Sequence, residues 1–366
     1  MTESKRGSAR NASLTVVSAG EVDATYQRIA RRLGASDEEA SLFAACYLRA
    51  DLRGLFTAGA AVVPYIAESI RADLMRFGAP FEILKRMPAT ALIDGHSGVG
   101  SIVATKAMDL ASDMATEAGV GIATIRNSGD FGLASNHPLQ AAARGQIGVA
   151  MRNGTPRVAP WGGRDAFFGT NPVSVAVPAA AEPPIVIDMA SGSFSVGRTV
   201  FAARDRIRMP SPHLVDSDGN YTDDPTGIVV DALDRESALR GALVSLGHKG
   251  YCWQLIVEVL AGVLSGAGTS NDNDFAPSAM HRWGEGTFVM AIEVDAFMPA
   301  NEFNAAVDQL AQALRAVRPA HGFECVRVPG ELSFANEVER REHGVPLRRE
   351  DWDAVVDLAR QLDEEQ

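Results

Sequence analysis

The feature that most constrains the fold is a change of pattern near residue 90. Before that point apolar residues recur at helical spacing; after it, short β-like runs alternate with helical segments until the chain ends in helices again. The expected strands are Thr90–Asp94, Gly121–Arg126, Ile147–Arg152, Val173–Pro178, Ile185–Met189 and Phe288–Val294, with Phe323–Val328 as a further candidate. The sequence therefore predicts an α/β fold of the mixed α+β kind, built around a central mixed β-sheet.

The helical ends of the chain indicate a second domain. Ser18 with Glu21, and Ser36 with Glu39, have the spacing of capping boxes that begin helices. A single core rarely grows past roughly 250–300 residues, so we expect two domains in a chain of 366 residues. We predict a helical domain from residues 14–75 plus 300–366, a central α/β domain over 76–299, and a disordered N-terminus over 1–13.

Charge and composition exclude several classes of partner. The net charge of −12 disfavours nucleic acid, because such a surface repels phosphate backbones. Tyr251–Leu264 is apolar on most sides but too short to span a bilayer, so we expect a buried helix there and a mobile loop over Leu264–Pro277. No CxxC spacing or leader-like segment is present, which predicts a cytoplasmic protein without a metal site. The cysteines are Cys46, Cys252 and Cys325.

Common nucleotide-binding fingerprints are missing from the sequence. The nearest candidate for a dinucleotide fingerprint, Gly95–Gly100, has its glycines in the reverse spacing, so the sheet is not predicted to be a Rossmann fold. No GxxxxGK[ST] word is present, which argues against a P-loop nucleotidase.

Three loops nevertheless carry more special residues than ordinary turns need. Asn127–Gly132 follows a strand and precedes a helix, where backbone amides suit an anion such as pyrophosphate. Its Asp130 opposes that charge and suits a cap or a hydroxyl contact. Gly169–Pro172, with Pro160–Gly163 nearby, permits close approach of a ligand to the backbone, and Asp188–Ala190 ends a strand. Each loop alone is typical of a turn, but the three together favour a site.

Two basic side chains have alternative interpretations. Lys249, after His248, is either a solvated lysine or a partner for a phosphate or carbonyl group. His137 follows the loop that contains Asp130, and its role is either structural or catalytic.

In this order, the sequence words resemble the malate/L-lactate dehydrogenase-like family of NAD(P)H oxidoreductases, which includes ureidoglycolate dehydrogenase and piperideine-2-carboxylate reductase. The matching words are Ala50–Gly54, Asn127-Ser128, Phe131-Gly132, Gly169–Pro172, Asp188–Ala190, His248–Tyr251 and Val328–Glu331. The resemblance implies a non-Rossmann fold, a small-molecule substrate, NADH or NADPH as cofactor, and a homodimer with its active site near the subunit interface.

The resemblance also implies roles for individual residues. The residues that it assigns to dinucleotide binding are Asp130, Phe131, Gly132, Leu133, Asp188, Met189, Ala190, His248 and Lys249. Thr170 and the turn at Val196-Gly197 are implied to face the substrate.

The sequence departs from the family where proton transfer is expected. The family's Ser-His-Gly triplet reads Thr57-Ala58-Gly59, and the arginine that grips a substrate carboxylate is replaced by Val62. The family's HFG word begins with Asp130, and Arg198 stands where a charge-relay acid is expected. Alanine cannot donate a proton and valine cannot bind a carboxylate, so efficient reduction of a 2-oxoacid is not expected.

Three functions therefore remain open. The first is an NAD(P)H-dependent reductase with an altered substrate, such as an imine or an uncharged carbonyl, in a pocket that includes Ala58 and Val62. Its protons then come from another group, for which the candidates are Asp130, His137 and Thr57. The second is a non-redox enzyme, such as a cyclase, isomerase or lyase, and the third is a catalytically silent binding protein.

Overall fold

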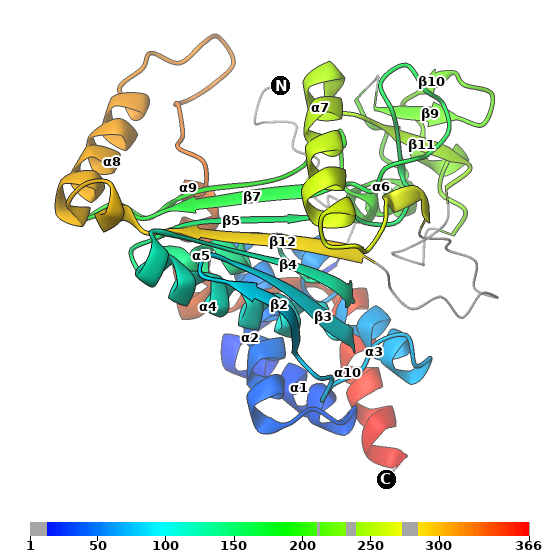
Figure 1. Ribbon diagram of the computed structural model, residues 1–366. Helices are drawn as coiled ribbons and strands as arrows, with labels where there is room; N and C mark the ends of the chain where they lie inside the picture. The colour runs from blue at the N-terminus through cyan, green and yellow to red at the C-terminus, as the bar shows by residue number, and fades with distance from the viewer. Residues whose placement is uncertain (1–12, 211–212, 232–238, 273–284, 366) are drawn as a thin grey trace.

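The computed structural model describes residues 13–210, 213–231, 239–272 and 285–365 (Figure 1). Its centre is a seven-stranded mixed sheet of order β2-β3-β4-β12-β5-β7-β8. β3 and β4 are parallel, and all other neighbouring pairs in this sheet are antiparallel. The strands are β2 (Glu82–Met87), β3 (Thr90–Gly98), β4 (Val120–Ser128), β5 (Ile147–Arg152), β7 (Pro172–Val177), β8 (Ile185–Ala190) and β12 (Glu285–Ile292). The predicted mixed α/β fold is confirmed.

Helices cover both faces of this sheet. α4 (Gly100–Ala118) and α5 (Asn136–Ala142) lie below it in Figure 1, and α7 (Gly247–Val257) with its π-helical continuation η4 (Glu258–Val263) lies above. Because side chains alternate along a strand, Ala150 packs with the α4 core whereas Val149 and Met151 pack towards η4. The sheet is therefore buried on both faces along its centre.

A helical layer lies below α4 and joins the two ends of the described chain. It contains α1 (Ala19–Arg32), α2 (Asp37–Arg53), α3 (Val63–Arg71) and α10 (Arg349–Glu364), which share one apolar core. β1 (Leu14–Val17) pairs antiparallel with β13 (Val345–Arg348) beside them. The Ser36–Glu39 capping box is present, and the Ser18 side chain accepts a hydrogen bond from the Glu21 amide.

The C-terminal third contains two helices that lie in different parts of the structure. α9 (Glu331–His343) packs on α2, but α8 (Ala300–Arg315) lies apart at the far end of the sheet (Figure 1). There Asp308 accepts amide hydrogen bonds from the turn before β8, and Arg315 pairs with Glu182 at 2.7 Å. Of the residues expected in the helical domain after 300, those from α9 onward pack with it.

A smaller sheet of order β10-β9-β11-β6 stands at the opposite end, with α6 (Val196–Arg204) beside it. None of its short strands was predicted; they are β6 (Val158–Ala159), β9 (Leu214–Asp216), β10 (Tyr221–Thr222) and β11 (Gly241–Val244). The predicted strand at Phe323–Val328 is wrong, because that segment has no ladder partner among the described residues.

Three further expectations meet the structure with mixed results. The predicted buried helix at Tyr251–Leu264 forms, but one apolar face of it is exposed. The expected disordered residues 1–12 and the second part of the expected loop 264–277 lie outside the described residues. Within the described ranges, no helix combines the length and apolar character needed to cross a membrane.

Candidate active site

The family-like words meet where the helical layer, the β4 and β8 ends and the smaller sheet adjoin. The Ser135 amide, in the loop after β4, donates to Asp188 Oδ2 at the end of β8 at 2.9 Å. Asn136, at the start of α5, donates to the Cys46 carbonyl of α2 at 3.1 Å. These contacts hold the loop at 129–135 between the sheet and the helical layer.

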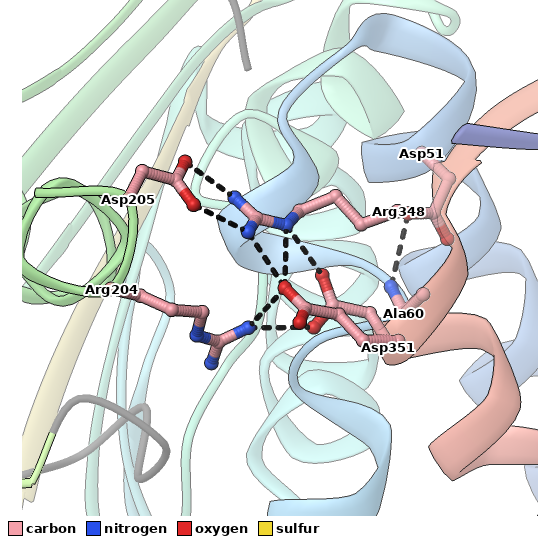
Figure 2. Close-up of polar contacts among 7 residues, drawn as sticks. Asp51, Ala60, Arg204, Asp205, Arg348 and Asp351 are labelled. Atoms are coloured by element: carbon pink, nitrogen blue, oxygen red, sulfur yellow. Dashed lines mark hydrogen bonds and ion pairs between the residues drawn. The ribbon is translucent and has the colours of Figure 1, made fainter. Parts of the chain in front are cut away.

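The buried side chain of Asp51 holds the loop that carries Thr57 and Ala58. Asp51 is fully buried, and its carboxyl accepts a hydrogen bond from the Ala60 amide at 3.0 Å (Figure 2). It also accepts one from the Tyr26 hydroxyl at 2.7 Å. A Cβ on Gly59 would lie 1.9 Å from Asp51 Oδ1, so only glycine permits this contact. Burial raises the pKa of Asp51 to about 7, against the lowering effect of the Ala60 and Tyr26 hydrogen bonds.

This support leaves Thr57 and Ala58 partly exposed on the 3₁₀ turn η2 (Phe56–Ala58). Val62 differs from the expectation of a substrate contact. Its side chain is 1% exposed and belongs to the core of the helical layer. A residue so enclosed does not offer a surface to a substrate in this conformation.

The Asp130 carboxylate accepts hydrogen bonds from two neighbouring groups. Its Oδ1 accepts from the Gly132 amide at 2.6 Å, and its Oδ2 lies 3.4 Å from Arg152 Nη1. Arg152 also pairs with buried Glu285. Phe131 and Leu133 turn their side chains into the protein interior, so they can offer only backbone groups to a ligand, whereas Gly132 has a left-handed φ of 73°.

His137, a candidate proton donor, lies in the protein interior. The side chain is 0% exposed, its Nε2 lies 3.0 Å from the Phe131 carbonyl oxygen, and its ring packs against the Phe131 ring. Burial lowers the pKa of His137 to about 4. The imidazole is therefore a neutral group inside the protein in this structure, and its catalytic role stays a prediction.

Asp188 occupies a recessed position that solvent can reach. The residue is exposed, yet protein surrounds its carboxyl, and this burial raises its pKa while Ser135 and Arg53 act to lower it. Arg53 itself is 3% exposed and pairs with Glu337 of α9 at 3.0 Å. The sequence analysis missed Arg53 and Ser135 as site residues, although Arg53 lies in the quoted word Ala50–Gly54. Met189 and Ala190, which follow Asp188, are partly exposed.

The Thr170 turn and the start of α7 join the same region through Ser191. The Ser191 amide donates to the Thr170 carbonyl at 3.0 Å, and the Leu246 amide donates to the Ser191 carbonyl at 3.1 Å. His248 and Lys249 follow on the exposed first turn of α7. The expected contributors Thr170, Asp188–Ala190 and His248-Lys249 are therefore linked by consecutive backbone hydrogen bonds.

Val196 and Gly197 form the first turn of α6 rather than an isolated turn. Ser195 caps this helix by accepting from the Arg198 amide at 3.3 Å, and Val196 and Gly197 are both buried. The other end of α6 is fastened to the helical layer, as Figure 2 shows: Asp205 binds Arg348 at 2.9 and 3.0 Å, and Arg204 lies 3.3 Å from Asp351. These ion pairs fix α6 relative to the layer that carries η2.

A separate polar cavity of about 290 Å³ opens at the ends of β3 and β4. Of the sequence words quoted for the site, it includes only Asn127. Its lining residues are Asp73, Arg76, Asp94, His96, Ser97 and Asn127. Nowhere in the described ranges do histidine, cysteine and acidic side chains gather as a metal site would require.

Comparison with known proteins decides the family. The family described as malate/L-lactate dehydrogenase matches residues 17–356. The chain belongs to the malate/L-lactate dehydrogenase family. Malate dehydrogenase of Pyrococcus abyssi is 31% identical over 92% of this chain and 91% of its own length. L-sulfolactate dehydrogenase of Methanocaldococcus jannaschii is 30% identical over 91% of this chain and 93% of its own.

Solved structures show the same likeness. Malate dehydrogenase from Entamoeba histolytica superposes with a TM-score of 0.90 at 26% identity, covering 96% of this chain and 99% of the other. Δ1-Piperideine-2-carboxylate reductase from Pseudomonas syringae pvar. tomato gives a TM-score of 0.82 at 26% identity, covering 94% and 99%. This malate/L-lactate dehydrogenase family member is therefore an oxidoreductase, and NAD(P)H is its cofactor, as expected from the sequence.

The residues present fit a dinucleotide. The exposed His248 and Lys249 stand at the start of a helix, where backbone amides and positive charge suit a pyrophosphate. The open Asp188–Ala190 segment lies next to that helix start through Ser191, and Asp188 can accept a hydroxyl hydrogen bond.

Proposed function

We propose that this enzyme uses NADH or NADPH to reduce a C=N bond, or an uncharged carbonyl, rather than a 2-oxoacid. The observation that carries the proposal is the apolar character of η2 and the residues after it. Ala58 has no proton to donate, and Val62, which is enclosed in the core, stands where the resemblance implies an arginine. A substrate carboxylate placed beside η2 would lack the charge-assisted hydrogen bond that an arginine provides.

An iminium substrate suits a site with alanine at position 58 better than a ketone does. The bound reduced nicotinamide supplies a hydride, and an iminium carbon accepts it without a proton donor because the displaced electron pair neutralises nitrogen. A ketone needs a positioned acid, which typically contributes about 10²–10⁴-fold in rate. In this proposal the partly exposed Thr57 provides the hydroxyl group of the η2 turn, and Thr170 lies across from the Asp188 segment.

We also propose that the enzyme is a homodimer and that α7 with η4 forms part of its interface. Their outward face is apolar and exposed, and a monomer rarely leaves so continuous a patch in water. The exposed residues are Trp253 (43%), Leu255 (51%), Ile256 (42%), Val259 (50%), Val263 (57%) and Leu264 (57%). Since His248 and Lys249 begin the same helix, a second subunit on this face comes close to the proposed cofactor site.

Location and partners follow from charge and thiols. We propose a cytoplasmic protein with a small-molecule substrate and no nucleic-acid partner, on the basis of the net charge of −12 and three unpaired cysteines.

The deciding experiment measures binding of NADH and NADPH by calorimetry, followed by dinucleotide oxidation with cyclic imines, uncharged carbonyls and 2-oxoacids. We expect micromolar binding of one dinucleotide and turnover with imines or uncharged carbonyls. Preference for 2-oxoacids would refute the altered-substrate proposal. Binding without turnover of any compound would favour the non-redox enzyme or the silent binding protein.

A further inference from the structure

A buried glutamate holds the turn that carries Thr170. Glu258, at the junction of α7 and the π-helical η4, is 3% exposed and makes no ion pair with any described residue. Its Oε1 accepts from Asn171 Nδ2 at 2.8 Å and from the Ser270 hydroxyl. Its Oε2 accepts from the Ser270 amide at 2.8 Å and from Asn153 Nδ2 at 3.2 Å. All the groups that donate these hydrogen bonds to the Glu258 carboxylate are uncharged.

These bonds fix a turn with an uncommon backbone. Asn171 has a φ of 42°, a left-handed conformation that non-glycine residues seldom adopt. Glu258 binds the Asn171 side chain directly, and the same Ser270 hydroxyl that donates to Glu258 accepts from the Gly169 amide at 3.0 Å. The two residues that flank Thr170 are therefore both held by one carboxylate, one directly and one through Ser270.

The constraint continues from this turn to the end of β8. The Thr170 carbonyl accepts from the Ser191 amide, and the Ser191 hydroxyl donates to the Asn171 carbonyl at 2.8 Å. Ser191 follows the Asp188–Ala190 segment directly. π-Helical turns often mark functional positions, and here the π-helix begins at the glutamate itself.

We propose that Glu258 is a positioning residue of the active site, which aligns Thr170 and the Asp188–Ala190 segment for dinucleotide and substrate. The proposal rests on the proposed function, since it assigns those segments to ligand binding. A glutamine at this position has the same shape but places an NH₂ group against one of the donor pairs. A donor facing a donor leaves both unsatisfied inside the protein.

The test uses the full-length chain and compares Glu258→Gln with Glu39→Gln. Glu39 is a matched control, because it is also buried (8% exposed) and accepts from backbone amides, but it lies in the helical layer. Hydrogen exchange without ligand should show faster exchange at the Gly169 and Ser191 amides in Glu258→Gln only. Calorimetry with NADH and NADPH should show about tenfold weaker binding in Glu258→Gln than in Glu39→Gln.

A second variant separates positioning from general destabilisation. In Glu258→Gln combined with Asn171→Asp, the glutamine NH₂ faces a carboxylate, so exchange and affinity should return towards wild type. Unchanged exchange in Glu258→Gln would overturn the proposal, as would changed exchange with unchanged dinucleotide affinity. If wild-type protein binds neither dinucleotide, the proposed function fails, whereas the exchange experiment still reports whether Glu258 holds the turn.

Discussion

At the scale of single residues, this protein places acids where their surroundings decide what they can do. Asp51 lies in an apolar core with two donors and supports the η2 loop, whereas Asp130 lies beside Arg152 and the Gly132 amide. Neither acid has the exposed, donor-free surroundings of a proton donor that meets substrate.

Asp51 should give folding stability a specific pH dependence. Its folded-state pKa, about 7, lies above the ordinary aspartate value of 3.8, so the folded state holds its proton more tightly. Stability from this group is fully present below about pH 4 and is lost as pH rises towards 7, with a slope of up to about 1.4 kcal/mol per pH unit. Urea unfolding at several pH values should show this slope in wild type and a reduced slope in Asp51→Asn. Equal slopes in the two proteins would contradict the assignment.

Restoring the residues that the resemblance implies tests the proposed effect of Thr57, Ala58 and Val62 on the choice of substrate. Thr57→Ser with Ala58→His should raise 2-oxoacid reduction, because it returns a proton donor to a partly exposed turn. Adding Val62→Arg should destabilise the protein by several kcal/mol unless η2 and the start of α3 move, because Val62 is enclosed in the core. Steady-state kinetics and urea unfolding of the double and triple variants check both statements. No gain of 2-oxoacid reduction in either variant would show that other residues exclude this substrate.

At the scale of elements, sequence patterns located most of the main sheet and several helices, but not the smaller sheet. The six principal strand predictions hold because β-branched runs coincide with long ladders, as in β4 and β12. β6 and β9–β11 were missed because strands of two to four residues have too little pattern to detect. Phe323–Val328 has a β-like composition, but a strand also requires a partner, which a local pattern cannot reveal.

The site was predictable to a similar degree. The family-like words identified Thr170, Asp188 and His248 as neighbours, and the structure links them through Ser191. The complete burial of His137 was not predicted, because spacing does not reveal burial. Asp51 and Glu258 were missed because they have partners from other parts of the chain, as with Tyr26 and Asn171.

The ion pairs between α6 and α10 are a testable element-scale feature. The Arg348 side chain is 5% exposed and binds Asp205 through two hydrogen bonds (Figure 2). Arg348→Met should cost roughly 3 kcal/mol, because it leaves the largely enclosed Asp205 and Asp351 carboxylates without this buried partner. Arg360→Met removes a solvent-exposed pair with Asp357 and should cost at most about 1 kcal/mol. Similar losses of unfolding free energy for the two variants in urea would show that the Arg348–Asp205 pair does not hold α6 in place.

At the scale of the whole molecule, the exposed apolar face of α7 and η4 is the basis of the proposed dimer. The earlier prediction of a buried helix followed from apolar residues on most sides, and such a pattern does not distinguish burial within a chain from burial between chains. The exposed face and the cofactor words lie on one continuous helical segment.

Charge on this face should separate the subunits. Val259→Glu with Val263→Lys should convert a dimer to monomers in analytical ultracentrifugation, because desolvating these charges opposes association. Val338→Lys provides a matched control, since Val338 is 69% exposed on α9. A wild-type protein that sediments as a monomer would refute the proposed interface.

The pairing of β1 with β13 bears on how the protein is made. One strand comes from the beginning of the described chain and the other from its end, and the core of the helical layer needs α10 as well as α1 and α2. On the ribosome, α1 and α2 therefore emerge long before the segments that bury their apolar faces. The apolar faces of α1 and α2 therefore stay uncovered while the central sheet is synthesised. Nascent chains should need chaperone protection at the N-terminal helices until synthesis is almost complete.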